Sequence, residues 1–246
     1  MRVLIPGGFE QVRAAGIVML VRSDAREWLV PLLLAATRDP EALDARPIAG
    51  GRGGAVHIRV KAEELVLRAC RRGGLPAWVL RDTYFGCRPR PFREVGALAS
   101  LRQRGVPVVE AMGACVRWLV PGCYKGWIAT RYVAGARSLW DWATRTEGPW
   151  DRRVVWHTVG RAIRRLHDAG ARHPDLNLHN LLLAAGADAP TVWLVDFDRP
   201  WLSGGSGPGA DLPRLERSAR KLDARGQWVT PADLADLRAG YAGAAP

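Results

Sequence analysis

Three polar residues with a particular spacing indicate which chemistry this chain could perform. Asp175 and Asn180 lie five positions apart in the polar stretch His173–Asn180, and Asp196 follows a short apolar run, Val192–Val195. Phosphoryl transfer requires such a set, because one carboxylate accepts a proton from the acceptor hydroxyl or orients it. An amide oxygen and a second carboxylate hold Mg²⁺ on the nucleotide phosphates. The spacing fits the kinase pattern H-x-D-x-x-x-x-N followed by D-F-x, with Asp175 as the catalytic carboxylate.

The neighbouring polar side chains leave some roles open. Asn180 and Asp196 are the predicted metal ligands, and Asp198, two residues further on, is a candidate for an additional carboxylate. His173 and His179 are alternative metal ligands. A packed or hydrogen-bonding loop residue is the preferred interpretation of His173, and the role of His179 stays open.

The elements around this stretch are predicted to place its ends together. Apolar residues recur at three–four spacing between Trp150 and Ala169, which indicates a helix, and Gly170 stands at the usual position past a helix end. Leu181–Leu183 and Thr191–Val195 then form a hairpin. The predicted metal ligands lie at the two ends of that hairpin.

A second group of residues has the types that bind phosphates. Gly51, Arg52, Gly53 and Gly54 form a glycine-rich loop before two apolar strands, 55–60 and 65–68. Such a loop lets backbone N–H groups approach phosphates, although glycine clusters are also common in plain turns. The second strand ends on Arg68, where a kinase presents its phosphate-pairing lysine. Lys61 is the competing cation, but it falls in the turn between the strands.

A helix after this hairpin supplies a carboxylate for Arg68. The segment Pro91–Leu98 has apolar residues at helical spacing, with Glu94 on a different face. In a kinase, a helix carboxylate pairs with the strand cation and holds it toward the phosphates. A solvated surface carboxylate is the alternative interpretation of Glu94.

A short linker suggests two lobes. The strand Trp127–Val133 is followed by Ala134-Gly135, a natural hinge against which adenine is expected to lie. The sequence therefore predicts an α+β, two-lobed protein-kinase-like fold. Residues 1–133 form a β-rich N-lobe that binds nucleotide phosphates, and residues 134–246 form a reduced, mainly helical C-lobe with the catalytic loop and the metal-binding hairpin.

The composition limits the class of partner. The chain has 246 residues, of which 48% are hydrophobic, and a formal net charge of +12. This excess predicts an anionic partner, namely nucleic acid, a phosphorylated substrate or an acidic membrane surface. The basic amphipathic segment Leu212–Ala224 is interpreted as a solvated face, with a patch for an anionic substrate or membrane as the alternative. No signal peptide or spanning segment is expected, because the run Trp28–Ala36 is too short.

The chain resembles the lipopolysaccharide 3-deoxy-D-manno-octulosonic acid (Kdo) kinases, which are relatives of the protein kinases. Two segments are specific to that family, Arg71–Leu75 (Arg-Arg-Gly-Gly-Leu) and Asp175–Asn180 (Asp-Leu-Asn-Leu-His-Asn). Segments shared with kinases at large are Gly51–Gly53, Leu65–Arg68, Phe92–Glu94, Gly135–Leu139, Leu166–Gly170 and Val195–Arg199. The chain departs from the family at Pro174 and at Ala69-Cys70, and neither departure removes a catalytic group.

The resemblance implies an activity and a place in the cell. It implies transfer of the ATP γ-phosphate to the 4-hydroxyl of Kdo on a lipid A precursor, Kdo-lipid IVA, in lipopolysaccharide core biosynthesis. The implied location is the cytoplasmic face of the bacterial inner membrane, where the protein would be peripheral and meet an anionic surface, with no nucleic acid as partner. An arginine at position 68 is then a feature of the family.

Two other functions compete with this one. The first is another small-molecule kinase, which phosphorylates heptose or an aminoglycoside, although a cationic aminoglycoside suits a chain of net charge +12 poorly. The second is a catalytically silent, basic module on a kinase-like fold that binds membrane or nucleic acid. Intact Asp175, Asn180 and Asp196 weigh against the silent module.

Overall fold

A computed structural model describes most of the chain as two compact units. One unit contains residues 1–100 and 110–132, and the other contains 101–109 and 133–246. The predicted lobe boundary after residue 133 differs in one respect, because 101–109 pack with the second unit. The described residues are 5–38, 43, 45–48, 54–70, 82–145, 150–186, 189–197, 201–202 and 211–244. Of the predicted site residues, Gly51, Arg52, Gly53 and Asp198 lie outside these ranges.

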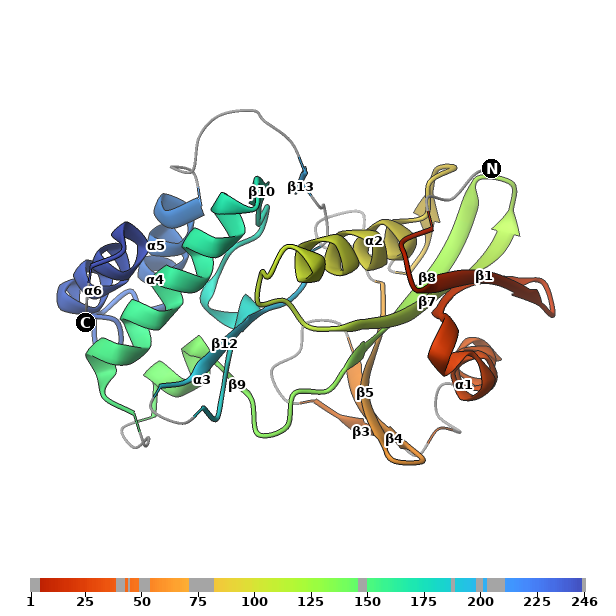
Figure 1. Cartoon of the computed structure of the whole chain (residues 1–246), viewed down its shortest axis with the longest axis horizontal. Coiled ribbons are helices and arrows are strands. Elements are labelled where there is room, and N and C mark those ends of the chain that lie inside the picture. Colours follow the sequence, from red (N-terminus) through yellow and green to blue (C-terminus); the bar gives the residue numbers. More distant parts are fainter. Residues whose placement is uncertain are drawn as a thin grey trace. The chain divides into compact units, whose positions relative to one another are not determined.

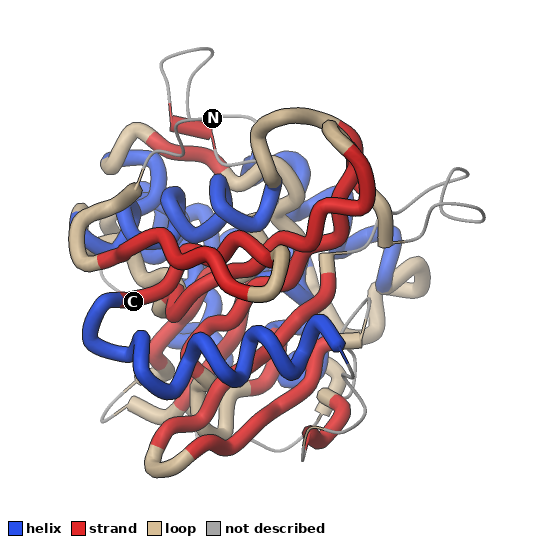
Figure 2. The backbone as a smooth tube through the Cα atoms, turned by 90° about the vertical axis from the view of Figure 1, so that its right-hand side faces the viewer, coloured by secondary structure: helices blue, strands red, loops and turns tan. Residues whose placement is uncertain are grey.

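The first unit is built on an antiparallel sheet (Figure 1). Its strands are β1 (Phe9–Ala14), β2 (Ile17–Arg22), β3 (Ala45–Pro47), β4 (Ala55–Val60), β5 (Glu63–Ala69), β6 (Tyr84–Phe85), β7 (Ala111–Val120) and β8 (Cys123–Arg131). Their spatial order is β1-β2-β7-β8-β5-β4-β3, and β6 pairs with β8. In Figure 2 these strands run side by side with a helix lying across them.

Two helices accompany this sheet, α1 (Arg26–Arg38) and α2 (Arg90–Gln103). The apolar side of α1 packs on the sheet, where Leu29 and Leu33 are fully buried with residues of β2 and β5. The close approach requires Gly113 on β7, because a Cβ there would lie 2.8 Å from the carbonyl oxygen of Leu20 and 3.0 Å from Leu29 Cδ2. The apolar run 28–36 therefore forms the core helix of this unit.

The predicted hairpin before Arg68 is confirmed. Strand β4 pairs with β5 from Ala55 opposite Arg68 to Val60 opposite Glu63. Lys61 lies in the turn, as predicted, with a positive φ of 55°. The predicted helix 91–98 is also confirmed as part of α2.

The second unit is mainly helical. Its helices are α3 (Leu139–Ala143), α4 (Arg152–Asp168), α5 (Asp211–Leu222) and α6 (Pro231–Ala242), and its strands are β9 (Arg137–Ser138), β10 (Ala171–Arg172), β11 (Leu181–Ala184), β12 (Thr191–Leu194) and β13 (Trp201–Leu202). The predicted second hairpin is confirmed, with β11 antiparallel to β12 and Leu181 opposite Leu194. Strand β9 extends it to three strands, and β10 pairs with β13.

Helices α4 and α6 pack at very short range because glycines face each other. A Cβ at Gly160 would lie 2.1 Å from the carbonyl oxygen of Leu237, and a Cβ at Gly240 would lie 2.1 Å from that of His157. Any larger side chain at either position would force the helices apart.

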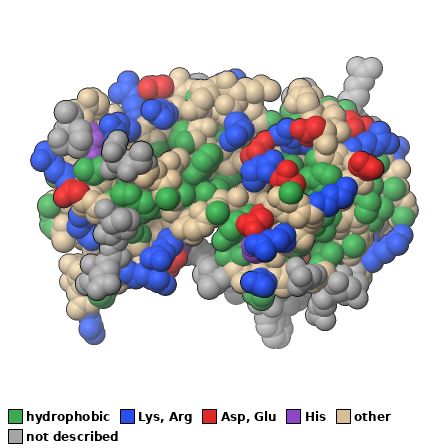
Figure 3. All heavy atoms as spheres, turned by 60° about the horizontal axis from the view of Figure 1, so that its bottom comes forward, with side chains coloured by type: hydrophobic (Ala, Val, Ile, Leu, Met, Phe, Trp, Pro, Cys, Tyr) green, Lys and Arg blue, Asp and Glu red, His purple; other side chains and the backbone are tan. Residues whose placement is uncertain are grey.

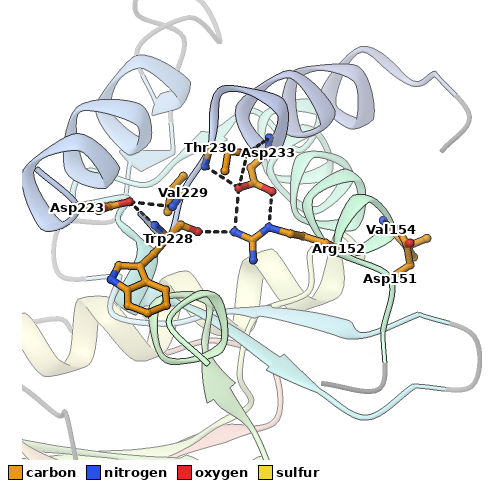
Figure 4. Close-up of polar contacts among 8 residues, drawn as sticks. All are labelled: Asp151, Arg152, Val154, Asp223, Trp228, Val229, Thr230 and Asp233. Carbon is orange, nitrogen blue, oxygen red and sulfur yellow. Dashed lines mark hydrogen bonds and ion pairs between the residues drawn. The ribbon is translucent and has the colours of Figure 1, made fainter. Parts of the chain in front are cut away.

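A polar network fixes the start of α6 against α4 (Figure 4). The buried Asp233 accepts two hydrogen bonds from Arg152, at 2.7 and 2.8 Å, and forms a capping box with Thr230. Asp223 accepts backbone N–H bonds from Gln227, Trp228 and Val229 at 2.7 to 2.9 Å, which closes the loop before α6. Helix α4 also packs against β10, which directly precedes the loop His173–Asn180, and against β12.

None of the helices in the described part of the chain combines the length and the apolar character needed to cross a bilayer.

Candidate active site

The loop that carries Asp175 is held by hydrogen bonds to its own backbone. Asn177 and Asn180 both donate side-chain N–H bonds to the carbonyl oxygen of Asp175, at 2.9 and 2.8 Å. Asn177 also accepts a bond from the backbone N–H of His179 at 3.0 Å, which starts a short 3₁₀ turn. The side chain of Asp175 itself is exposed. The loop thus fixes the backbone of Asp175 while its carboxylate faces solvent.

The same loop is joined to Asp196. The backbone N–H of Val195 donates to the carbonyl oxygen of Asn180 at 3.1 Å, directly beyond the last pair of the β11–β12 hairpin. The structure therefore brings Asn180 next to the residue before Asp196. Asp196 has a positive φ of 65°, a left-handed conformation that is uncommon for a residue with a Cβ. Such backbone strain often marks a functional site.

His173 connects the two ends of this arrangement. Its Nε2 lies 2.8 Å from the carbonyl oxygen of Val195, and its ring lies 4.6 Å from that of Phe197. Both rings are buried. Burial lowers the pKa of His173, so the ring is neutral and its Nε2 donates to Val195. The packed, hydrogen-bonding interpretation of His173 is confirmed.

A carboxylate outside the motif anchors the loop from the other side. Asp211, the first residue of α5, accepts the backbone N–H of His173 at 2.9 Å and lies 3.1 Å from His167 Nε2. His167 in turn contacts the hydroxyl of Tyr241 through Nδ1 at 2.8 Å. Burial of Asp211 opposes ionisation, but the bonds from His167 and His173 outweigh it and lower the pKa of this carboxyl.

Asp211, His167 and Tyr241 were not among the predicted site residues. For Asp211, the local signal was an acid at the start of an amphipathic helix, which also fits an ordinary helix terminus. Their contacts join α4, α5 and α6 to the loop, so they depend on tertiary packing.

In the first unit, Arg68 and Glu94 form an ion pair. Arg68 Nη2 lies 2.6 Å from Glu94 Oε1, and the side chains are 19% and 2% exposed. The alternative of Glu94 as a solvated surface carboxylate is therefore wrong. A buried charge pair of this kind is costly to desolvate, so it is expected where the position of a cation matters.

The end of the glycine-rich loop lies beside this pair. Gly54 immediately precedes Ala55, which is directly opposite Arg68 in the β4–β5 ladder. Gly54 has a φ of +76°, a conformation that glycine adopts without strain. Gly54, which has no Cβ, therefore lies next to a held cation, an arrangement suited to phosphate oxygens.

The donor set fits a metal that is shared with phosphates rather than held by protein alone. Within the described part of the chain, no cluster of three or more His, Cys, Asp or Glu residues could hold a metal ion. Mg²⁺ on a nucleotide needs only one or two protein ligands besides phosphate oxygens and water. Asn180 donates through Nδ2 to the carbonyl oxygen of Asp175, so its Oδ1 is the atom that can bind a cation. Asp196 directly follows Val195, whose backbone N–H bonds to Asn180.

Comparison with known proteins gives consistent similarities. Residues 43–241 match the sequence profile described as the lipopolysaccharide kinase (Kdo/WaaP) family. A 3-deoxy-D-manno-octulosonic acid kinase from Xanthomonas campestris pv. campestris (strain B100) is 39% identical over 185 residues, which cover 72% of this chain and 71% of that protein. One of the same name from Xylella fastidiosa (strain M12) is 37% identical over 207 residues, covering 80% and 79%.

A solved structure supports the fold. The chain matches a structure described as WaaP in complex with acyl carrier protein, with a TM-score of 0.57 and 20% identity, over 92% of this chain and 89% of that one. This similarity, with the β-sheet unit and the helical unit, confirms the predicted two-lobed kinase-like fold.

Proposed function

The chain belongs to the lipopolysaccharide kinase (Kdo/WaaP) family, and on that premise we propose that it transfers the γ-phosphate of ATP to the 4-hydroxyl of Kdo on a lipid A precursor. Relatives that are 37 to 39% identical are named Kdo kinases, which favours Kdo over heptose as the acceptor sugar. The observation that carries the proposal is the catalytic loop, in which the exposed Asp175 is held next to Asn180 and Val195 in a chain of this family.

Each predicted residue has a defined role in this proposal. Asp175 orients the acceptor hydroxyl and takes its proton. Asn180 and Asp196 would hold Mg²⁺, and Asp198 remains a proposed additional carboxylate. Bound ATP with Mg²⁺ supplies the transferable phosphoryl group and neutralises its developing charge.

The first unit would bind the phosphates. Gly51, Arg52, Gly53 and Gly54 would offer backbone N–H groups to the phosphates, and Arg68 would offer a planar, two-pronged guanidinium that suits phosphate oxygens. Glu94 holds Arg68 in place through the observed ion pair. This assignment treats residues 1–133 as the N-lobe and 134–246 as the C-lobe.

The proposed setting is the cytoplasmic face of the bacterial inner membrane. The net charge of +12 suits both an acceptor that carries sugar carboxylates and lipid phosphates and an anionic leaflet. Peripheral attachment is proposed, because the acceptor is anchored in the membrane by its acyl chains.

A phosphotransfer assay tests the proposal. Labelled ATP is offered with Kdo-bearing lipid A precursor, with a heptose-bearing acceptor and with no acceptor, and the position of the new phosphate is read by mass spectrometry. We expect product only with the Kdo-bearing acceptor, with the phosphate on the 4-hydroxyl. Transfer to heptose but not Kdo would select the heptose kinase alternative. Salt-sensitive nucleic-acid binding without ATP turnover would select the silent module.

A further inference from the structure

The turn between β7 and β8 presents apolar side chains to solvent. Val120 is 59% exposed and Leu119 is 44% exposed at the end of β7, and Phe85 on the adjacent β6 is 56% exposed. These are three of the four large apolar residues that are exposed in the described part of the chain; the fourth is Ile5. The turn lies at an outer corner of the first unit (Figure 1, light green). We call Phe85, Leu119 and Val120 the apolar tip.

The exposure of the tip is built into the strand pairing. Trp118 lies opposite Tyr124 and Val120 lies opposite Cys123, so Leu119 is an extra residue that forms a β-bulge. The bulge breaks the alternation of faces, which leaves both Leu119 and Val120 exposed where a regular strand would turn one inward. Phe85 also lies opposite Cys123, so Val120, Cys123 and Phe85 form one row across three strands.

The residues behind the tip pack the sheet. The next row consists of Trp118, Tyr124 and Tyr84, whose rings lie within 5.3 to 5.7 Å of one another along the row. Arg117 and Lys125 form the following pair. Tyr84 and Tyr124 are buried, so this row packs within the first unit, and Lys125 forms an ion pair with Asp82 at 2.5 Å. The membrane-facing part of this end is therefore the apolar tip itself.

Charge alone does not single out this surface. On the face shown in Figure 3, Lys and Arg side chains occur at intervals, many of them beside Asp or Glu. Near the tip, the exposed Arg88 follows Phe85 by three residues. Arg117 donates to the carbonyl oxygen of Thr37 at 3.1 Å, and no carboxylate among the described residues forms an ion pair with it. A cationic surround complements an anionic leaflet and opposes pairing with a second basic copy of this chain.

We propose that the apolar tip inserts into the interface of an anionic membrane and docks the enzyme on the leaflet that carries its acceptor. Only the identity of the acceptor in this proposal rests on the proposed function; the docking surface itself does not. The occupant is a lipid surface, because three exposed apolar side chains beside the cations Arg88 and Arg117 fit the boundary between acyl chains and anionic headgroups.

Vesicle flotation of the full chain tests the docking without any acceptor. Vesicles of phosphatidylethanolamine and phosphatidylglycerol are compared with neutral phosphatidylcholine vesicles. Leu119→Ser/Val120→Ser should weaken binding to the anionic vesicles at least about tenfold, from the apolar area lost at the interface. Ile5→Ser, at a residue of similar exposure (46%), is the matched control and should bind as the parent does. The apolar double variant Leu119→Phe/Val120→Ile should bind the anionic vesicles at least as tightly as the parent does.

Several outcomes would overturn the proposal. One is a parent chain that does not bind anionic vesicles, and another is a double serine variant that binds as well as the parent. Loss of binding in Arg217→Gln/Lys221→Gln instead would assign docking to the exposed basic face of α5. A dimer in light scattering that the double serine variant abolishes would assign the tip to self-association.

An activity comparison separates this proposal from the proposed function. The double serine variant should lose activity on acceptor embedded in vesicles but keep parental activity on a deacylated, water-soluble Kdo-bearing acceptor. Equal loss on both acceptors would argue against docking. If the parent binds vesicles through the tip but phosphorylates neither acceptor, the proposed function fails and the docking surface stands.

Discussion

The proposed catalytic loop, His173–Asn180, and the Arg68–Glu94 pair are held in different ways. Asp175 is fixed through its backbone by amide side chains two and five residues away, and by a hairpin whose ends meet beside it. Arg68, on strand β5, is held by a carboxylate 26 positions away on helix α2. The loop therefore carries its geometry in its own sequence, whereas the ion pair depends on the placement of two elements.

The largest effect on activity is expected at Asp175, whose backbone is held by the loop while its side chain is exposed. Asp175→Ala should lower kcat by about 10³, because it removes the proposed general base while the exposed side chain contributes little to packing. The free energy of unfolding in urea should stay within about 0.5 kcal/mol of the parent's. Rates within tenfold of the parent would break the assignment of Asp175.

This difference explains what could be predicted from the sequence. The motif around Asp175, Asn180 and Asp196 is local, so spacing alone indicated its function and its hairpin. The sequence does not show that Glu94 is buried and paired, because a helix face becomes buried only when the sheet is in place.

The sequence also does not show how the loop is anchored. Asp211 lies 36 residues beyond Asp175 in the chain, and its bonds to His173 and His167 form only after α4 and α5 pack together. Gly160 and Gly240 are similar, since nothing in their local sequence shows that two helices meet there.

A double-mutant cycle sharpens the comparison in the first unit. Arg68→Gln should lower kcat/KM for ATP by roughly 10², as expected for the loss of one preorganised charge at a developing anion. Glu94→Gln should give a smaller loss, because Arg68 stays but is no longer held. The double variant should resemble Arg68→Gln alone if Glu94 acts through Arg68. Additive losses would show that Glu94 has a separate role.

A third change tests whether the loop depends on its anchor. Asp211→Ala removes the acceptor of the His173 N–H and of His167, so it should cost about 2 kcal/mol of stability and lower kcat by roughly tenfold. Asp211→Asn keeps an acceptor oxygen and should recover part of both losses. KM for ATP should change little, which distinguishes this loss from that of Arg68→Gln. Parental kcat in Asp211→Ala would show that the loop holds itself.

The smallest effect is a dependence of stability on pH that should come mainly from the second unit. Burial lowers the pKa of His173 and, together with the charge of Arg161, that of His157; both rings are buried. In the unfolded chain each histidine takes up a proton near pH 6.5, whereas the folded chain does so only at lower pH. The stabilisation is therefore complete above about pH 7.5 and falls as the pH drops through 6.5. Each histidine contributes a slope of at most about 1.4 kcal/mol per pH unit.

Hydrogen exchange read separately for the two units checks this sign. Between pH 7.5 and 5.5, after correction for the intrinsic exchange rate, protection in α4 and in the loop around His173 should fall before protection in β7 and β8 does. His157→Leu replaces one buried imidazole by an apolar side chain, so it should roughly halve the slope of the unfolding free energy over this range. An unchanged slope in His157→Leu, or earlier loss of protection in the β-sheet unit, would show that the acid sensitivity does not arise from these buried rings. The two units would then differ only in how their charged residues are held in position.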